Sequence, residues 1–261
     1  MPYVVAETLD AIGTISFDHD RKRNALSRAL IEEFITALHD FKAAKIRVVI
    51  IRARPGAKTW SAGHDLTELP EPGSGSDPLS YFDPLERLIR AISHFPAPVI
   101  GMIDGGVWGG AFELALTCDM LIGTRNVTFA ITPTKIGLPY NSTGLTHFLS
   151  ALGMNTVKEM FFTARSITAE RALQLGILNH LVTEAELEPF TYEMARAMAA
   201  NSPLCIAVIK EQLRIFGSAH ALSPETFERI QSLRQKVIDS RDYREGTRAI
   251  LEKRAPKFTG T

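Results

Sequence analysis

The sequence predicts an α/β protein, because short β-branched segments alternate with amphipathic segments of helical length through its first half. Residues 14–17 form the first predicted strand, and residues 47–51 form a second that is apolar enough to be buried on both faces. Between these strands, Ser27 is placed to cap a helix whose apolar side chains recur on one face. Strands that are separated by a helix in this way favour parallel pairing within one sheet.

The alternation continues through the first half of the chain. Residues 78–94 predict a second helix, and residues 98–103 predict another buried strand. A third helix, entered through glycines, is predicted over residues 109–116, and a strand follows it over residues 119–123. Residues 70–76 (PEPGSGS) have the composition of a loop. We therefore expect the first half to supply the strands of the core.

The second half is predicted to be mostly helical. Thr183 and Glu186 form a capping box at the start of one helix. Ser202 precedes a proline, which is typical of an N-cap followed by the first helical residue. Because strand signals end there, we expect an α/β core over residues 1–200 and a C-terminal helical region over residues 201–261.

The composition narrows the possible classes of function. The 261 residues include 29 basic and 29 acidic side chains, and this formal charge of zero argues against attraction to nucleic acids or membranes by bulk charge. No apolar run approaches the roughly 18–20 residues of a membrane span. Cys118 and Cys205 are the only cysteines, which is typical of a reduced, cytoplasmic protein. The absence of CxxC, HExxH, GxSxG and Walker-type phosphate-loop motifs argues against local metal, serine-nucleophile and nucleotide-hydrolysis sites.

Two segments are suited to offering backbone N–H groups to a ligand. Residues 61–66 (SAGHDL) follow a predicted strand, and their small side chains let a ligand approach the main chain. Residues 105–113 (GGVWGGAFE) are a glycine-rich entry into a helix, where the first N–H groups are unpaired and carry partial positive charge. Either segment alone is typical of a tight turn, but two such N–H groups aimed at one point would form an oxyanion hole.

The chain resembles the enoyl-CoA hydratase/isomerase, or crotonase, superfamily over nearly its whole length. The likeness rests on the segments RNAL (23–26), AGHD (62–65), GGAFELAL (109–116), residues 129–139 and ITAERALQLGILNHLV (167–182). The resemblance implies a crotonase-like spiral core of ββα units with a C-terminal helical trimerisation region. It also implies a homo-oligomer, either a trimer or a hexamer, that acts on acyl-CoA thioesters.

The resemblance also implies which residues bind the substrate. The N–H groups of His64 and Gly110 would hold the thioester carbonyl oxygen, while the His64 side chain would belong only to the pocket wall. Lys253 would reach a phosphate of the coenzyme, from the same subunit or from a neighbouring one. The complete set of residues implied to bind the substrate or its coenzyme A part is Ala25, Ala62, Gly63, Asp65, Leu66, Ala111 and Lys253.

One position departs from the family pattern and changes the expected reaction. Hydratases of this family use two glutamates to activate water; Glu113 matches the first, whereas Pro133 stands at the second. Hydration without the second carboxylate loses half of its acid–base machinery. Loss of CO2 from a malonyl-type thioester leaves an enolate, which an oxyanion hole stabilises directly. We therefore expect decarboxylation of malonyl-CoA or methylmalonyl-CoA to acetyl-CoA or propionyl-CoA.

Tyr140 and Thr132 are the candidates for orienting the carboxylate that is lost. The scissile C–C bond must stand perpendicular to the thioester plane, and neutral hydroxyl groups can hold the carboxylate in that pose. A lysine or arginine would instead stabilise the ground state. Thr132 is equally consistent with a plain loop hydroxyl. Three roles stay open for Glu113: orienting Tyr140, delivering a proton to the enolate, or a purely structural role.

Two alternatives to decarboxylation also stay open. The first is a hydratase or isomerase that acts on an enoyl-CoA through Glu113 alone, and the second is a non-catalytic acyl-CoA-binding or RNA-binding protein on the same fold. The neutral charge argues against RNA binding, and the presence of both glycine segments argues against an inert scaffold. We expect no metal, biotin or other cofactor, because coenzyme A is part of the substrate.

Overall fold

The computed structural model describes residues 2–69, 83–217 and 224–259, and its strands form two sheets. The first sheet contains, in spatial order, β1 (Val4–Leu9), β2 (Ile12–Phe17), β3 (Val48–Ala53), β5 (Val99–Ile103), β7 (Met120–Gly123) and β10 (His180–Leu181). The second contains β4 (Thr59–Ser61), β6 (Gly106–Trp108), β8 (Thr128–Ala130) and β9 (Ile167–Thr168). Neighbouring strands are parallel except at one edge of each sheet, where β1 is antiparallel to β2 and β9 is antiparallel to β8.

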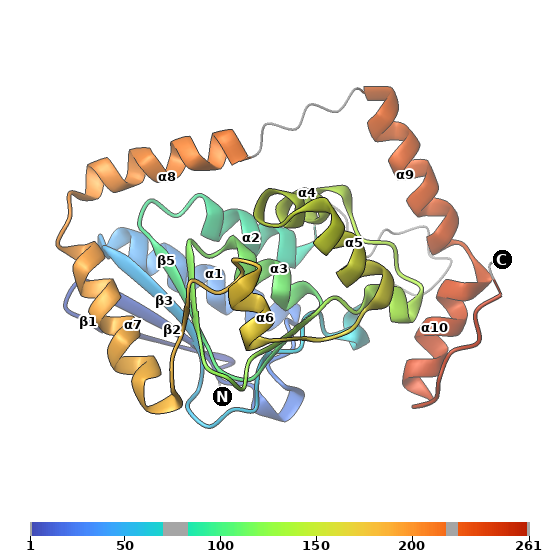
Figure 1. Ribbon diagram of the computed structural model, residues 1–261, viewed down its shortest axis with the longest axis horizontal. Coiled ribbons are helices and arrows are strands. Elements are labelled where there is room, and N and C mark those ends of the chain that lie inside the picture. Colours follow the sequence, from blue (N-terminus) through green and yellow to red (C-terminus); the bar gives the residue numbers. More distant parts are fainter. Residues whose placement is uncertain (1, 70–82, 218–223, 260–261) are drawn as a thin grey trace.

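Helices and short 3-10 turns connect these strands. The helices are α1 (Arg28–Ala43), α2 (Pro84–Ser93), α3 (Gly110–Thr117), α4 (Ser142–Ala151), α5 (Met154–Thr163), α6 (Ala169–Gln174), α7 (Glu184–Ala199), α8 (Pro203–Gly217), α9 (Pro224–Ile238) and α10 (Arg241–Leu251). The 3-10 turns are η1 (Asp20–Lys22), η2 (Leu66–Glu68) and η3 (Pro133–Ile136). In Figure 1, α8 extends along the upper left of the molecule, and α9 and α10 form its right side.

The larger sheet is covered on both faces, as the apolar sequence of β3 predicts. Val49 and Ile51 belong to the main core, which also contains the apolar faces of α1, α2 and α3. Val48 and Ile50 point to the opposite face, where α7 packs across the sheet. Because side chains alternate along a strand, one short segment supplies both cores.

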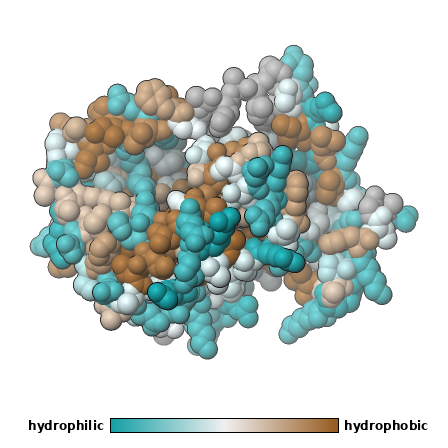
Figure 2. Space-filling model, in the orientation of Figure 1, coloured by the Kyte–Doolittle hydropathy of each residue, from teal (hydrophilic) through white to brown (hydrophobic). Residues whose placement is uncertain are grey.

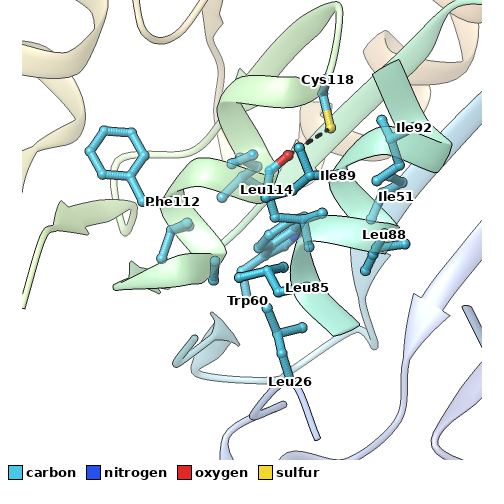
Figure 3. Packing of buried hydrophobic residues seen from close by; sticks show 14 of the residues in the cluster. Leu26, Ile51, Trp60, Leu85, Leu88, Ile89, Ile92, Phe112, Leu114 and Cys118 are labelled. Carbon is cyan, nitrogen blue, oxygen red and sulfur yellow. Dashed lines mark hydrogen bonds between the residues drawn. The ribbon is translucent and has the colours of Figure 1, made fainter. Parts of the chain in front are cut away.

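The main core also fixes the start of the helices that surround the site. Trp60 of β4 is fully buried, and Figure 3 shows it among the apolar side chains of α2 and near Leu114 of α3. At the end of α3, the thiol of the buried Cys118 donates to the carbonyl oxygen of Leu114 (3.8 Å). The exposed Cys205 is also free, so neither cysteine forms a disulfide.

The main features of the first half agree with the sequence prediction. The four predicted strands correspond to β2, β3, β5 and β7, and Ser27 caps α1 by accepting the N–H of Leu30 (3.3 Å). The capping box of Thr183 and Glu186 at the start of α7 is also confirmed. In the described residues, the predicted helix over 78–94 begins at Pro84. The predicted loop over 70–76 lies outside the described residues.

The C-terminal helices differ in how they pack. Along α8, large apolar side chains are exposed, including Leu204 and Phe216. By contrast, α10 packs against η3, where a side chain at Gly246 would clash with the carbonyl of Ile136. The boundary near residue 200 between an α/β core and a C-terminal helical region stays a prediction. The packing shows that α10 supports the η3 segment. In the described part of the chain, no helix is long and apolar enough to span a membrane.

Candidate active site

The three parallel strands of the smaller sheet end at the same edge and thereby bring three loops together. β4, β6 and β8 lie side by side, and the chain leaves them at Ala62, Gly109 and Ile131. Because the carboxyl ends of parallel strands meet at one edge, both glycine segments and the segment that carries Thr132 converge there. The Gly109 N–H donates to the carbonyl of Ala130 (2.9 Å) and ties the second segment to the third.

The two glycine segments are in direct contact through Gly63. This residue has a φ of +85°, and a Cβ there would lie 2.5 Å from the carbonyl oxygen of Trp108 and 2.9 Å from the nitrogen of Gly110. Only glycine allows both this backbone conformation and this close approach. In the described residues, the N–H groups of His64 and Gly110 donate to no protein acceptor. The contact therefore brings the segment that carries the unpaired N–H of His64 close to the unpaired N–H of Gly110.

The loop before α1 is fastened to the same edge by Asn24. Its side-chain amide donates to the carbonyls of Thr59 (3.0 Å) and Trp60 (3.1 Å), and its own carbonyl accepts the Ser61 hydroxyl (2.7 Å). The Leu26 N–H then donates to the carbonyl of Gly63 (2.8 Å). These bonds hold the RNAL segment against the first glycine segment.

The His64 side chain belongs to a residue of the pocket wall. Its Nε2 lies 3.1 Å from Oδ1 of Asp83, which caps α2 by accepting the N–H of Leu85 (2.8 Å). The imidazole thus fixes the His64 backbone relative to the start of α2.

Tyr140 and Glu113 form a buried hydrogen-bonded pair next to the glycine segments. The Tyr140 hydroxyl donates to Oε2 of Glu113 (2.5 Å), and the two residues are 8% and 2% exposed. Asn141 caps α4 directly after Tyr140 by accepting the N–H of Gly144. The ring of Tyr140 packs so closely against Gly144 that a Cβ there would clash with it. Glycine at this position is therefore needed for Tyr140 to reach Glu113.

Two further buried or half-buried ionisable groups surround this pair. His147 of α4 donates through Nδ1 to Oε1 of Glu113 (2.9 Å), and Asn141 donates to Oε1 of Glu86 (2.7 Å). Burial raises the pKa of Tyr140 well above its ordinary value, and the charge of Glu113 raises it further. Burial and the charge of Glu113 also raise the pKa of Glu86, although the Asn141 hydrogen bond opposes this. Burial alone would lower the pKa of His147, but its hydrogen bond to Glu113 and the charges of Glu113 and Glu86 raise it overall.

A cavity of about 420 Å³ opens at this edge of the sheet. Most of the predicted site residues line it: Ala25, Ala62, His64, Asp65, Leu66, Gly110, Thr132 and Tyr140. Pro133, which stands where the family has its second glutamate, also lines it. The Thr132 hydroxyl faces Gly109, since a Cβ on that glycine would lie 3.4 Å from it.

Four predicted residues do not line the cavity. Ala111 was expected to bind the substrate or its coenzyme, but it is fully buried in the main core because it points inward from the first turn of α3. Gly63 forms the contact between the two glycine segments, and Glu113 accepts the hydroxyl hydrogen of Tyr140. Lys253 lies just beyond α10, outside the cavity wall of its own chain.

Three basic residues in the cavity wall were not predicted as coenzyme-binding residues. Arg21, Lys22 and Arg23 all line it, and Lys22 forms an ion pair with Asp65 (2.7 Å). Burial alone would raise the pKa of Asp65, but the hydrogen bonds from Lys22 and Thr67 lower it overall. The signal in the sequence is the run RKR at residues 21–23, of which only Arg23 belongs to the RNAL segment.

The fold and the two neighbouring glycine segments point to a class of protein. The family model described as enoyl-CoA hydratase/isomerase matches residues 7–261, and the chain belongs to this family. This confirms the crotonase-like fold class that the sequence predicts.

Individual relatives narrow the comparison further. The chain is 48% identical over 258 residues to methylmalonyl-CoA decarboxylase of Escherichia coli (strain K12), which covers 99% of this chain and 98% of the relative. A structure of methylmalonyl-CoA decarboxylase in complex with 2-nitronate-propionyl-CoA aligns with a TM-score of 0.97 at 48% identity and covers 99% of each chain. A structure of the same kind of enzyme complexed with 2S-carboxypropyl-CoA also gives a TM-score of 0.97 at 48% identity, covering 99% of this chain and 98% of the other.

Proposed function

We propose that this protein decarboxylates methylmalonyl-CoA or malonyl-CoA to propionyl-CoA or acetyl-CoA and CO2. One observation carries the proposal: the unpaired N–H groups of His64 and Gly110 share a cavity with the Tyr140 hydroxyl, and Pro133 lines that cavity at the position of the family's second glutamate. The similarity to methylmalonyl-CoA decarboxylase over nearly the full length supports it.

The backbone N–H groups act on the charge that the reaction creates. When the C–C bond to the carboxylate breaks, its electron pair moves into the thioester and forms an enolate with charge on the oxygen. His64 and Gly110 would donate to that oxygen. Removing one donor from such a hole typically costs about 3–4 kcal/mol of transition-state stabilisation. The pair therefore provides the main electrostatic contribution to this reaction.

Neutral hydroxyl groups would orient the departing carboxylate. Tyr140 stays protonated because its pKa is raised, so it can donate a hydrogen bond at any physiological pH. Thr132 faces Gly109 at the same end of the cavity and can contribute a second hydroxyl. Both groups hold a carboxylate without a full positive charge, which would stabilise the ground state and oppose loss of CO2.

Hydration is disfavoured by the position of the carboxylate that it would need. Both oxygens of Glu113 already accept hydrogen bonds, from Tyr140 and from His147, and Glu113 is outside the cavity wall. Pro133 supplies no acid or base at the second position. A hydratase or isomerase acting through Glu113 alone would have to bring this carboxylate into the cavity and free one of its oxygens for water or substrate.

The phosphates of coenzyme A need cationic partners at the cavity. Arg21, Lys22 and Arg23 are exposed and line the cavity, so we assign the phosphates to this segment. Lys253 stays a candidate only as a contribution from a neighbouring subunit. This localised positive charge explains how a chain of zero net charge can bind a polyanionic coenzyme.

A homo-oligomer, either a trimer or a hexamer, is part of the proposal. The exposed apolar side chains of α8 support it, and Figure 2 shows apolar surface at the upper left, where α8 lies in Figure 1. Light scattering at micromolar concentration should give a mass of three or six chains, whereas a single-chain mass would contradict it. A cytoplasmic location is also proposed, because the described cysteines are both free.

The reaction is tested by offering methylmalonyl-CoA and crotonyl-CoA separately to the purified protein. We expect propionyl-CoA and CO2 from the first and no hydration of the second. Chromatography of the thioesters measures the first reaction, and loss of the conjugated absorbance measures the second. Hydration of crotonyl-CoA with methylmalonyl-CoA left intact would refute the proposal.

A further inference from the structure

His147 is not among the residues that line the cavity, and its Nδ1 lies 2.9 Å from Oε1 of Glu113. Its side chain is 35% exposed, whereas that of Glu113 is 3% exposed. Tyr140 bonds one carboxylate oxygen of Glu113, and His147 bonds the other. Starting from the cavity, the chain of contacts is therefore Tyr140, Glu113, His147.

The charge of Glu113 creates a problem for the proposed substrate. A malonyl-type thioester carries its own carboxylate, and Tyr140 would place that carboxylate one residue away from Glu113. Two carboxylates this close disfavour each other's charged form. The effect of Glu113 on its surroundings is already visible, because its charge raises the pKa of both Glu86 and Tyr140.

Tyr140 also has only one hydroxyl hydrogen, which it gives to Glu113 in this structure. To donate to a substrate carboxylate, it must withdraw that hydrogen from Glu113. A buried carboxylate that loses its donor carries the full desolvation cost unless another donor remains. His147 is such a donor, at 2.9 Å on the other oxygen.

We propose that His147 is a positioning residue that determines specificity for carboxylated thioesters: its imidazolium offsets the charge of Glu113 and lets Tyr140 turn toward the substrate carboxylate. The inference rests on the proposed function. Among the described residues, the charged groups that act on His147 are Glu113 from α3 and Glu86 from α2. Arg90 lies 4.0 Å from Glu86 on the same helix. Helix α5 packs beside α4, but none of its described charged groups shifts the pKa of His147.

The test compares two ligands that differ only in the carboxylate. Propyl-CoA and 2-carboxypropyl-CoA are thioethers, so neither is decarboxylated, and calorimetry gives the Kd of each. In His147→Gln, we expect 2-carboxypropyl-CoA to bind about tenfold more weakly, while propyl-CoA changes by less than about twofold. His39→Gln, the same change at an exposed site on α1, should alter neither Kd.

A second variant separates charge compensation from a structural role. Removing the Glu113 charge in Glu113→Gln/His147→Gln should restore most of the preference for 2-carboxypropyl-CoA. Equal weakening of both ligands in His147→Gln, or no weakening of either, would overturn the inference. So would a double variant that recovers none of the preference.

A pH series on the unaltered protein covers the case in which His147→Gln does not fold. The ratio of the two Kd values should change as pH rises through the titration of His147, with 2-carboxypropyl-CoA losing its advantage because the cation is lost. The phosphate titrations are common to both ligands and cancel in the ratio. A ratio that stays constant from pH 6 to 9 would overturn the inference.

Failure of the proposed function would give a different result. In that case the unaltered protein would leave methylmalonyl-CoA intact. If it decarboxylates methylmalonyl-CoA but His147→Gln keeps its ligand preference, only the role of His147 is wrong.

Discussion

Replacing Tyr140 with phenylalanine removes one hydroxyl and leaves the ring in place. The ring still packs on Gly144, but Oε2 of Glu113 loses its only described donor in a site where Glu113 is 2% exposed. Leaving one acceptor of a buried carboxylate unsatisfied costs about 1–3 kcal/mol of folding stability. For a chain of this size, that corresponds to a fall in Tm of roughly 2–12 °C.

The expected effect on catalysis comes from the same hydroxyl. A hydrogen bond to a charged group contributes about 1.5–3 kcal/mol, so losing the one that orients the departing carboxylate should lower kcat about 10- to 150-fold. Binding of propionyl-CoA should change little, since the product has no carboxylate for Tyr140 to hold. Steady-state kinetics on methylmalonyl-CoA and calorimetry with propionyl-CoA measure the two quantities.

A matched control separates the two effects. Tyr192 on α7 forms a hydrogen bond with the neutral Thr14 hydroxyl (2.7 Å) on the far side of the larger sheet. Tyr192→Phe should lower Tm by less than Tyr140→Phe does, because no buried carboxylate loses a donor, and it should leave kcat unchanged. If Tyr140→Phe keeps its kcat within about threefold of the unaltered value, a change of only about 0.6 kcal/mol, the orienting role is wrong.

Three further predictions concern the backbone and the cofactor requirement. Gly63→Ala should abolish activity, because its Cβ would lie 2.5 Å from a backbone oxygen. Gly56 also has a positive φ, but a Cβ there meets no neighbour, so Gly56→Ala should stay active. Measuring kcat of both variants checks this prediction. Gly144→Ala should reduce kcat at least about tenfold, because the added Cβ displaces Tyr140. The control Gly153→Ala, whose Cβ meets no neighbour, should leave kcat unchanged. Equal kcat values for the two variants would contradict this reasoning. Activity should survive treatment with EDTA or avidin, and its loss would show that a metal or biotin takes part.

The sequence predicted the larger sheet better than the smaller one. The strands β2, β3, β5 and β7 have apolar runs long enough to be recognised, and their helices carry clear caps. The strands β4, β6 and β8 each have three residues, which is too short for a period of two to be distinguished from a loop. Their pairing depends on contacts between distant segments, and these appear only in the folded chain.

In the site, too, some residues could be predicted from the sequence and others depend on tertiary packing. Gly63 and Gly110 were found because glycine itself is the signal for a close backbone approach. Ala111 was assigned to the coenzyme from its neighbours in sequence, but the helix turns it into the core. His147 belongs to no motif, and its contact with Glu113 depends on how α4 packs against α3. Its spacing of three residues from Gly144 on one helix was the signal that could have placed it near Tyr140.

The arrangement also explains how one fold can lose a glutamate and keep an enolate reaction. The N–H groups of His64 and Gly110 belong to the main chain, so their placement depends on the sheet edge and on Gly63, and no change at residue 133 removes them. What changes is the group that faces the enolate carbon. With Pro133 in the wall and Glu113 hydrogen-bonded to Tyr140 and His147, the two positions that carry the family's glutamates no longer offer a pair of carboxylates to activate water. The enolate must then be generated from within the substrate, and breaking the bond to a carboxylate is the route that requires no base.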